Sequence, residues 1–248
     1  MKATQKRNIL FLLGMLGMVL ALGLTGCAST GGGGSSGGAK LPAFGADLLA
    51  KSSPIPGGDP IRVPYTSLIS YYGYAKAGAE PDEMVEGHKT WYIYVWIPAV
   101  APEIGVRMIS PAPKGAEPTE GDFKSATWEE GKTDTEHYFD TWISLERAGN
   151  VISPEDIAGA SDWNRYDYND DSSEMPKNPA GLVRNSLFRV TTDASDPLKA
   201  LVRGLYRVGF STYKPGEVEG TFLAQIGAPI DLPGVIVGTL EEVQAAAE

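Results

Sequence analysis

Residues 90–98 read Thr-Trp-Tyr-Ile-Tyr-Val-Trp-Ile-Pro, the most strongly apolar and β-prone run of the chain after its N-terminal leader. Nearly every residue in the run is aromatic or β-branched, and these types favour strands. Alternation along a strand gives two apolar faces, one with Trp91, Ile93, Val95 and Ile97 and one with Tyr92, Tyr94 and Trp96. Both faces need cover, so the pattern predicts a central strand. Pro98 is expected to end it, because proline cannot donate a ladder hydrogen bond.

Other segments of the chain also read as strands, and they surround this one in sequence. Strands are predicted at 67–74, 105–110, 138–147, 186–192, 201–213 and 218–226. Pro215-Gly216 suits the centre of a type II turn, which predicts a hairpin between the last two. Residues 161–179 are polar and acidic and read as a long loop. Without a βαβ rhythm, the order predicts an antiparallel β-sandwich of jelly-roll type.

Two short helices are expected beside these strands. Ser153 precedes Pro154 and two acidic residues, a pattern that starts a short helix ending near residue 159. Thr239 and Glu242 have the spacing of a capping box for a terminal helix over 240–247.

Composition and charge limit the classes of function. The chain has 248 residues, 42% hydrophobic and 21% charged, which suits one folded domain with appendages. Its 31 acidic residues outnumber 21 basic ones, and three of the basic residues lie in the leader, so the rest carries 18 against 31. Such an acidic chain lacks the basic surface that nucleic acid requires. Cys27, the single cysteine, allows no internal disulfide and no cysteine-based zinc site.

The N-terminus has the layout of a bacterial lipoprotein signal. Three basic residues precede an apolar run over 9–24, and Leu-Thr-Gly-Cys follows, ending at Cys27. The apolar run is shorter than the roughly 20 residues that span a bilayer. We therefore predict a signal peptide over 1–26 and diacylglycerol with an N-acyl chain on Cys27. Ala28 and Ser29 follow in place of the aspartate that retains Gram-negative lipoproteins at the inner membrane, which favours the outer membrane.

A segment rich in Gly, Ser and Pro follows the predicted lipid. Residues 27–60 are therefore expected to be a flexible tether, and a coil of this length spans roughly 30 Å root-mean-square. Residues 61–248 are expected to form a single domain. The lipid is the predicted contact with the membrane, since more than one acyl chain holds a protein stably.

Signals for catalysis are weak. The sequence has no Gly-x-Ser-x-Gly, His-Glu-x-x-His or P-loop. His88 and His137 are more easily explained as surface or hydrogen-bonded residues than as catalytic bases, and the pair Glu129 and Glu130 as solvated carboxylates. A hydrolase with two acids far apart in sequence leaves no signature and stays an alternative.

The acidic segment contains a partial calcium pattern. Asp167, Asn169 and Asp171 alternate as the ligands do in the first half of a calcium loop. Ser172 then stands in the place of the required glycine and Asn178 in the place of the final glutamate. Spacing alone favours a solvated acidic loop over a calcium site.

Several long runs together resemble the major surface lipoprotein family of pathogenic Leptospira. They occur in the same order as in that family, over residues 67–227, and comprise Tyr71-Tyr72-Gly73-Tyr74 with Pro81-Asp82, residues 94–100 (YVWIPAV), residues 105–111 (GVRMISP), Phe139-Asp140-Thr141-Trp142-Ile143 with Glu146-Arg147, and residues 201–220 with TYKPGEV at 212–218. The tether, the middle loops and the C-terminus match poorly.

The resemblance implies a jelly-roll sandwich, a lipid anchor, no known enzymatic activity and a calcium site. The ligand positions of that site fall on Asp140 and Thr141 and on Asp170 and Asp171. A further family ligand, a tyrosine, is Arg184 here; its carbonyl would still serve, whereas its side-chain charge would weaken the site. Adjacent strand residues point to opposite faces, so we expect a backbone oxygen from Asp140 or Thr141, or a distorted strand.

Three functions follow as hypotheses. The first is a non-enzymatic, surface-exposed outer-membrane lipoprotein stabilised by calcium, which binds extracellular or envelope proteins or supports the envelope. The second is a metal-free structural lipoprotein that faces the periplasm. The third is the envelope hydrolase. The first combines the signal at Cys27 with the resemblance.

Overall fold

The structure, a computed structural model, describes residues 51–53, 61–63, 65, 67–192, 195–196, 200–230 and 232–247. The predicted signal peptide, Cys27 and most of the predicted tether lie outside these residues. One strand within the tether range, β1 (Lys51–Ser53), pairs antiparallel with β2 (Ile61–Val63), which lies at the start of the predicted domain. The predicted domain boundaries otherwise stay a prediction.

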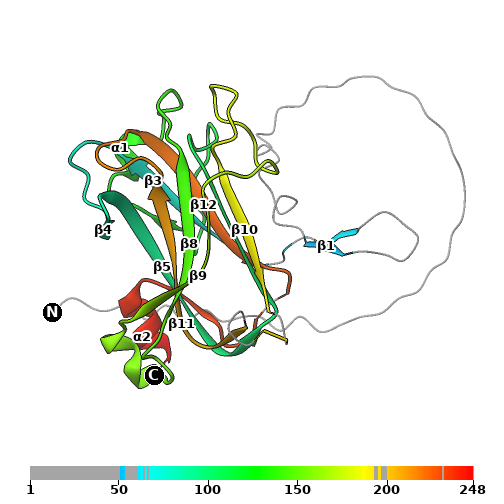
Figure 1. The fold of residues 1–248 in the computed structure, drawn as a ribbon. Helices are drawn as coiled ribbons and strands as arrows, with labels where there is room; N and C mark the ends of the chain where they lie inside the picture. Colours follow the sequence, from blue (N-terminus) through cyan, green and yellow to red (C-terminus); the bar gives the residue numbers. More distant parts are fainter. Residues whose placement is uncertain are drawn as a thin grey trace, which may run out of the picture. The chain divides into compact units, whose positions relative to one another are not determined.

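The described chain from residue 67 onward forms the predicted antiparallel β-sandwich of jelly-roll type with a few short helices (Figure 1). Its strands are β3 (Ser67–Ala75), β4 (Glu83–Val85), β5 (His88–Ala101), β6 (Glu103–Ile109), β7 (Phe123–Lys124), β8 (Thr141–Ala148), β9 (Trp163–Asn169), β10 (Ser186–Thr191), β11 (Leu201–Thr212), β12 (Gly220–Ala228) and β13 (Ile236–Gly238). The helical elements are α1 (Trp128–Gly131), the 3₁₀ turn η2 (Pro154–Gly159) and α2 (Leu240–Ala247).

Two sheets make the sandwich. One has the order β10-β6-β12-β3-β7, and the other has the order β13-β5-β11-β8-β9 with β4 on β5. All pairs are antiparallel except the short parallel pair β3–β7. The chain crosses repeatedly between the sheets, so segments distant in sequence meet at their ends.

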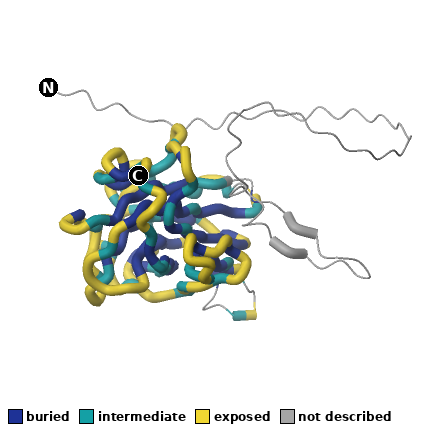
Figure 2. Tube along the Cα trace, turned by 90° about the horizontal axis from the view of Figure 1, so that it is seen from above, coloured by how far each residue is buried: buried dark blue, intermediate teal, exposed yellow. Residues whose placement is uncertain are grey.

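The main core lies between the sheets and is rich in aromatic rings. Phe222 of β12 is fully buried; its ring stacks 5.9 Å from that of Tyr71 and lies 5.1 Å from that of Trp91. Figure 2 shows the buried strands enclosed by exposed connections. Burying aromatic side chains of this size supplies much of the stability of a fold.

The strand predicted over 90–98 is confirmed as β5 and has a strand on both sides. It pairs with β11 along most of its length and with β13 and β4 on its other edge. Trp91 faces the main core. Trp96, on the opposite face, packs in a second cluster with Ile157 and with Val243 of α2. Both faces are covered, as its residue pattern predicts.

The expectation that Pro98 ends this strand is wrong. β5 continues to Ala101, and its register with β11 shifts between Val202 and Gly204, which pair with Val100 and Ile97. Pro98 therefore lies at a β-bulge, one of the few places in a sheet where a missing N–H costs no ladder bond.

The expected hairpin of the last two long strands is also wrong. β11 already has β5 and β8 on its two sides, so β12 joins the opposite sheet between β3 and β6. Gly216 does adopt a positive φ of 83°, as a type II turn requires. The turn thus connects the two sheets.

Residues 163–169, predicted as part of a long loop, form β9 and pair with β8. The register of this pair shifts opposite Tyr166. Tyr166 turns toward the main core, where its ring lies 5.6 Å from that of Tyr206. This bulge breaks the alternation by which a strand is recognised in sequence. The acidic loop begins only after Asn169.

Both predicted helices are present. Ser153 and Asp156 form a capping box at η2, a 3₁₀ turn. At α2, the N–H of Thr239 donates to Glu242 Oε2 at 3.0 Å and the N–H of Glu242 donates to Thr239 Oγ1 at 3.2 Å. Both elements cover the outer face of β5 around Trp96.

Candidate functional site

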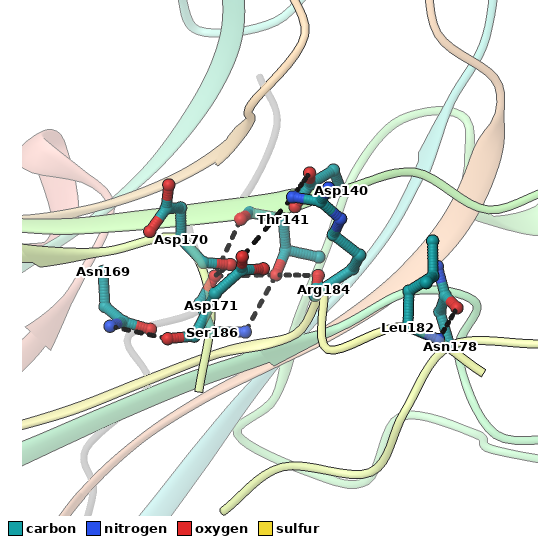
Figure 3. Close-up of polar contacts among 9 residues, drawn as sticks. All are labelled: Asp140, Thr141, Asn169, Asp170, Asp171, Asn178, Leu182, Arg184 and Ser186. Carbon is teal, nitrogen blue, oxygen red and sulfur yellow. Dashed lines mark hydrogen bonds and ion pairs between the residues drawn. The ribbon is translucent and has the colours of Figure 1, made fainter. Parts of the chain in front are cut away.

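The four predicted calcium ligands meet at one corner of the sandwich (Figure 3). Thr141 is the first residue of β8 and Asp140 precedes it. Asp170 and Asp171 follow the last residue of β9, which pairs with β8. Arg184 lies two residues before β10. The pairing of β8 with β9, and the approach of β10, bring these residues of three separate segments together.

Thr141 joins the start of β8 to the start of β10. Its Oγ1 lies 2.7 Å from Ser186 Oγ and accepts a hydrogen bond from the N–H of Ser186 at 3.0 Å. Its own N–H donates to the carbonyl of Arg184 at 3.1 Å. Thr141 is fully buried. Its hydroxyl is therefore engaged in holding one sheet against the other.

Asp140 lies just outside the regular strand. β8 begins at Thr141, and the Asp140 carbonyl accepts a hydrogen bond from the N–H of Tyr213 at 2.9 Å. The expected alternation conflict between adjacent strand residues is avoided, because only one of the two belongs to the strand.

The guanidinium of Arg184 lies between two of the predicted carboxylate ligands. Its Nη1 is 2.9 Å from Asp140 Oδ2 and 3.4 Å from Asp171 Oδ2. The Arg184 side chain is 40% exposed and that of Asp140 is 20% exposed, so water screens the pairs only in part. Asp170 contributes its carbonyl, which accepts from Ser186 Oγ at 3.2 Å.

Asp140 has fewer partners than its charge requires. Burial raises the pKa of its carboxyl to about 6; the charge of Arg184 opposes this rise, while Asp171 and Asp170 add to it. Its Oδ1 is buried without a hydrogen-bond partner among the described residues. At this corner the positive charge of Arg184 thus faces the carboxylates of three aspartates, Asp140, Asp170 and Asp171.

In this arrangement the residues do not fit a calcium ion. Calcium takes 6–8 oxygens at 2.3–2.6 Å. Arg184 Nη1 already lies on the Asp140 oxygen that such an ion requires, and two cations cannot share it without strong repulsion. The Thr141 hydroxyl and the Arg184 carbonyl are hydrogen-bonded to each other at 3.3 Å. Calcium here stays a prediction from the sequence.

Amide side chains hold the acidic loop in place: Asn185, which the sequence analysis did not single out, and Asn169, which it considered only as a partial calcium-loop ligand. Buried Asn185 accepts from the N–H of Ser110 at 3.0 Å and donates to the carbonyl of Pro176 at 2.6 Å. Asn169 Oδ1 accepts from the N–H of Leu187 at 3.0 Å. Asparagine in a polar loop gives no signal that separates a fixed residue from a solvated one, so these roles required the structure.

A second group of side chains has metal-ligand chemistry. Ligand atoms of Asp134, His137 and Glu219 lie within 4.8 Å of one another. Asp134 Oδ2 lies 3.0 Å from His137 Nδ1, and Glu219 accepts from the hydroxyl of Tyr74 at 3.0 Å. His137 and Glu219 are exposed. The group is a hydrogen-bonded surface cluster. This agrees with the interpretation of His137 as a surface or hydrogen-bonded residue.

The remaining candidates for catalysis are engaged in ordinary contacts. His88 Nδ1 lies 2.7 Å from the carbonyl of Thr212, and its ring packs 5.9 Å from that of Trp142. Glu129 forms ion pairs with Lys124 and Lys132. These are the contacts of surface residues that stabilise turns and strands.

The comparisons with known proteins point to one family. A family model described as the surface lipoprotein of the order Spirochaetales matches residues 59–237. A search of the curated proteins gives no match. Within the described residues, no helix combines the length and apolarity needed to cross a bilayer. Since the match covers most of the chain, the protein belongs to the surface lipoprotein family of the order Spirochaetales.

Proposed function

We propose that this surface lipoprotein is held in the outer membrane by lipid on Cys27, faces outward and acts without catalysis. Its role would be to bind or adhere to extracellular or envelope proteins, or to support the envelope. The observation that carries the proposal is the lipoprotein signal ending at Cys27, upstream of a sandwich that belongs to a surface lipoprotein family. A sandwich on the flexible tether predicted from the sequence suits presentation of a surface away from the membrane.

Labelling of the lipid tests the proposal. Cells fed an alkyne analogue of palmitate should label the wild-type chain, and the Cys27→Ser chain should carry no label and leave the membrane fraction. The matched control is Ser29→Ala, which changes a nearby residue and should label as the wild type does. A Cys27→Ser chain that is still labelled would contradict the proposal.

The choice between binding and envelope support requires cells. A strain lacking the protein should lose adhesion to host or matrix proteins if the role is binding, and should become sensitive to detergent if the role is structural. A strain that keeps both its adhesion and its resistance to detergent would count against both roles.

Calcium binding can be tested on the purified protein. Saturation of a weak extracellular-type site, at 100 times its dissociation constant, would stabilise the fold by about 2.7 kcal/mol. Thermal unfolding in calcium against chelator measures that difference. The guanidinium of Arg184, which lies between Asp140 and Asp171, argues against calcium at this corner.

A further inference from the structure

We propose that the guanidinium of Arg184 is a tethered cation that takes the place of calcium at the corner formed by Asp140 and Asp171. The fold is then held at this corner without a metal, and removal of the guanidinium charge opens a calcium site. The inference concerns this chain's own residues and does not depend on lipid at Cys27.

Backbone hydrogen bonds fix the point of the chain from which the guanidinium extends. The Arg184 carbonyl accepts from the N–H of Thr141, and the next residue, Asn185, is buried with its carbonyl bonded to the N–H of Ser172 at 2.9 Å. Arg184 therefore starts from a fixed point beside the two carboxylates. A cation held in this way competes at a local concentration that free calcium has to exceed.

The contacts of the guanidinium match those that a bound ion would make. Its Nη1 approaches one oxygen of Asp140 and one of Asp171, residues from either side of the corner (Figure 3). Hydrogen bonds from arginine to carboxylates are charge-assisted and directional. The same side chain thus links the start of β8 to the loop after β9, which is the link that an ion would make.

The carboxylates around the guanidinium are of the kind that bind a divalent cation. Asp140 Oδ1 is buried and has no hydrogen-bond partner among the described residues. Asp170 and Asp171 lie close enough for their charges to act on Asp140. Three carboxylates against one guanidinium leave an excess of negative charge. Without Arg184, both oxygens of Asp140 would be available, and oxygen-rich acidic sites are those that calcium prefers.

The test is a calcium titration of the full-length chain in detergent, by calorimetry and by thermal unfolding in calcium and in chelator. The wild-type midpoint should be the same in both. Arg184→Gln should bind calcium at least tenfold more tightly than the wild type and should unfold at a higher temperature in calcium than in chelator.

Two variants serve as controls. Arg189→Gln removes an arginine that pairs with Glu174 of the same loop, at 3.0 Å, and should respond to calcium as the wild type does. Arg184→Lys keeps the charge and should stay insensitive to calcium.

Three results would overturn the proposal: a wild-type chain that binds calcium as tightly as Arg184→Gln, an Arg184→Gln chain that folds and ignores calcium, and an Arg184→Lys chain that gains the same calcium response. An Arg184→Gln chain that folds only in calcium would support it.

Discussion

The hydroxyls of Thr141 and Ser186 lie 2.7 Å apart and connect β8 of one sheet to β10 of the other. Ser186 Oγ also donates to the carbonyl of Thr141 at 2.8 Å. Both residues are fully buried, so these polar groups have no water to replace a lost partner.

Replacement of Thr141 by valine keeps the shape of the side chain and removes its hydroxyl. The N–H of Ser186 then loses its acceptor in a buried place, which costs about 1–3 kcal/mol of the free energy of unfolding. Urea unfolding measures the loss. Thr133→Val, at an exposed position, should change the same free energy by less than about 0.5 kcal/mol. Equal effects of the two would contradict this role of Thr141.

The close approach of Gly73 to Phe222 gives a second prediction. A Cβ on Gly73 would stand 2.1 Å from Phe222 Cζ, inside the ring's own volume. Gly73→Ala therefore has to displace a fully buried ring, at a cost of about 1–3 kcal/mol or more in unfolding free energy. Gly159→Ala is the control, since a Cβ there meets nothing within 4 Å. A Gly73→Ala chain as stable as the wild type would show that the ring moves freely.

His137 supplies a prediction about pH. Hydrogen bonding to Asp134 raises the pKa of the imidazole above its ordinary value of 6.5, and the charges of Asp134 and Glu219 act in the same direction. A raised folded-state pKa stabilises the fold below the unfolded value, and this contribution is lost as pH rises through the higher folded value. NMR titration should find a pKa above 6.5 in the wild type and a lower one in Asp134→Asn. An unchanged pKa in that variant would rule out the pair as its cause.

The start of α2 depends on its capping box. Thr239→Ala removes the oxygen that accepts from the N–H of Glu242, and loss of an N-cap typically costs about 1 kcal/mol. α2 carries Val243, which is fully buried against Trp96, so fraying should expose this cluster. Hydrogen exchange at α2 is the measurement, with Glu241→Gln as a control outside the capping pair. Faster exchange confined to α2 is expected, and unaltered exchange would contradict the role of the cap.

The sequence predicted those strands whose alternation is unbroken. The run over 90–98 and the alternate buried positions Phe139, Thr141, Ile143 and Leu145 follow the period-two pattern and are found as expected. The predictions for Pro98 and for the segment around Tyr166 are wrong because each residue lies at a bulge, and a bulge depends on the partner strand. The partner of β12 was misjudged because a turn type constrains two residues and does not choose a sheet.

At the candidate site, too, the sequence predicts one part and only the structure shows the other. The resemblance named Asp140, Thr141, Asp170 and Asp171, and the structure brings all four together. Sequence alone left open whether Arg184 would contribute through its carbonyl or disturb the site through its charge. The structure shows the carbonyl on Thr141 and the guanidinium on Asp140 and Asp171. Such a choice depends on side-chain direction, which no motif encodes.

The most direct test of the account is protease shaving of intact cells. A surface-exposed lipoprotein should be digested while a periplasmic control protein stays whole, and the released sandwich should leave its lipid-bearing N-terminus in the membrane. A protein that resists digestion until the outer membrane is opened would face the periplasm. This result would contradict the proposal that the protein is exposed on the cell surface.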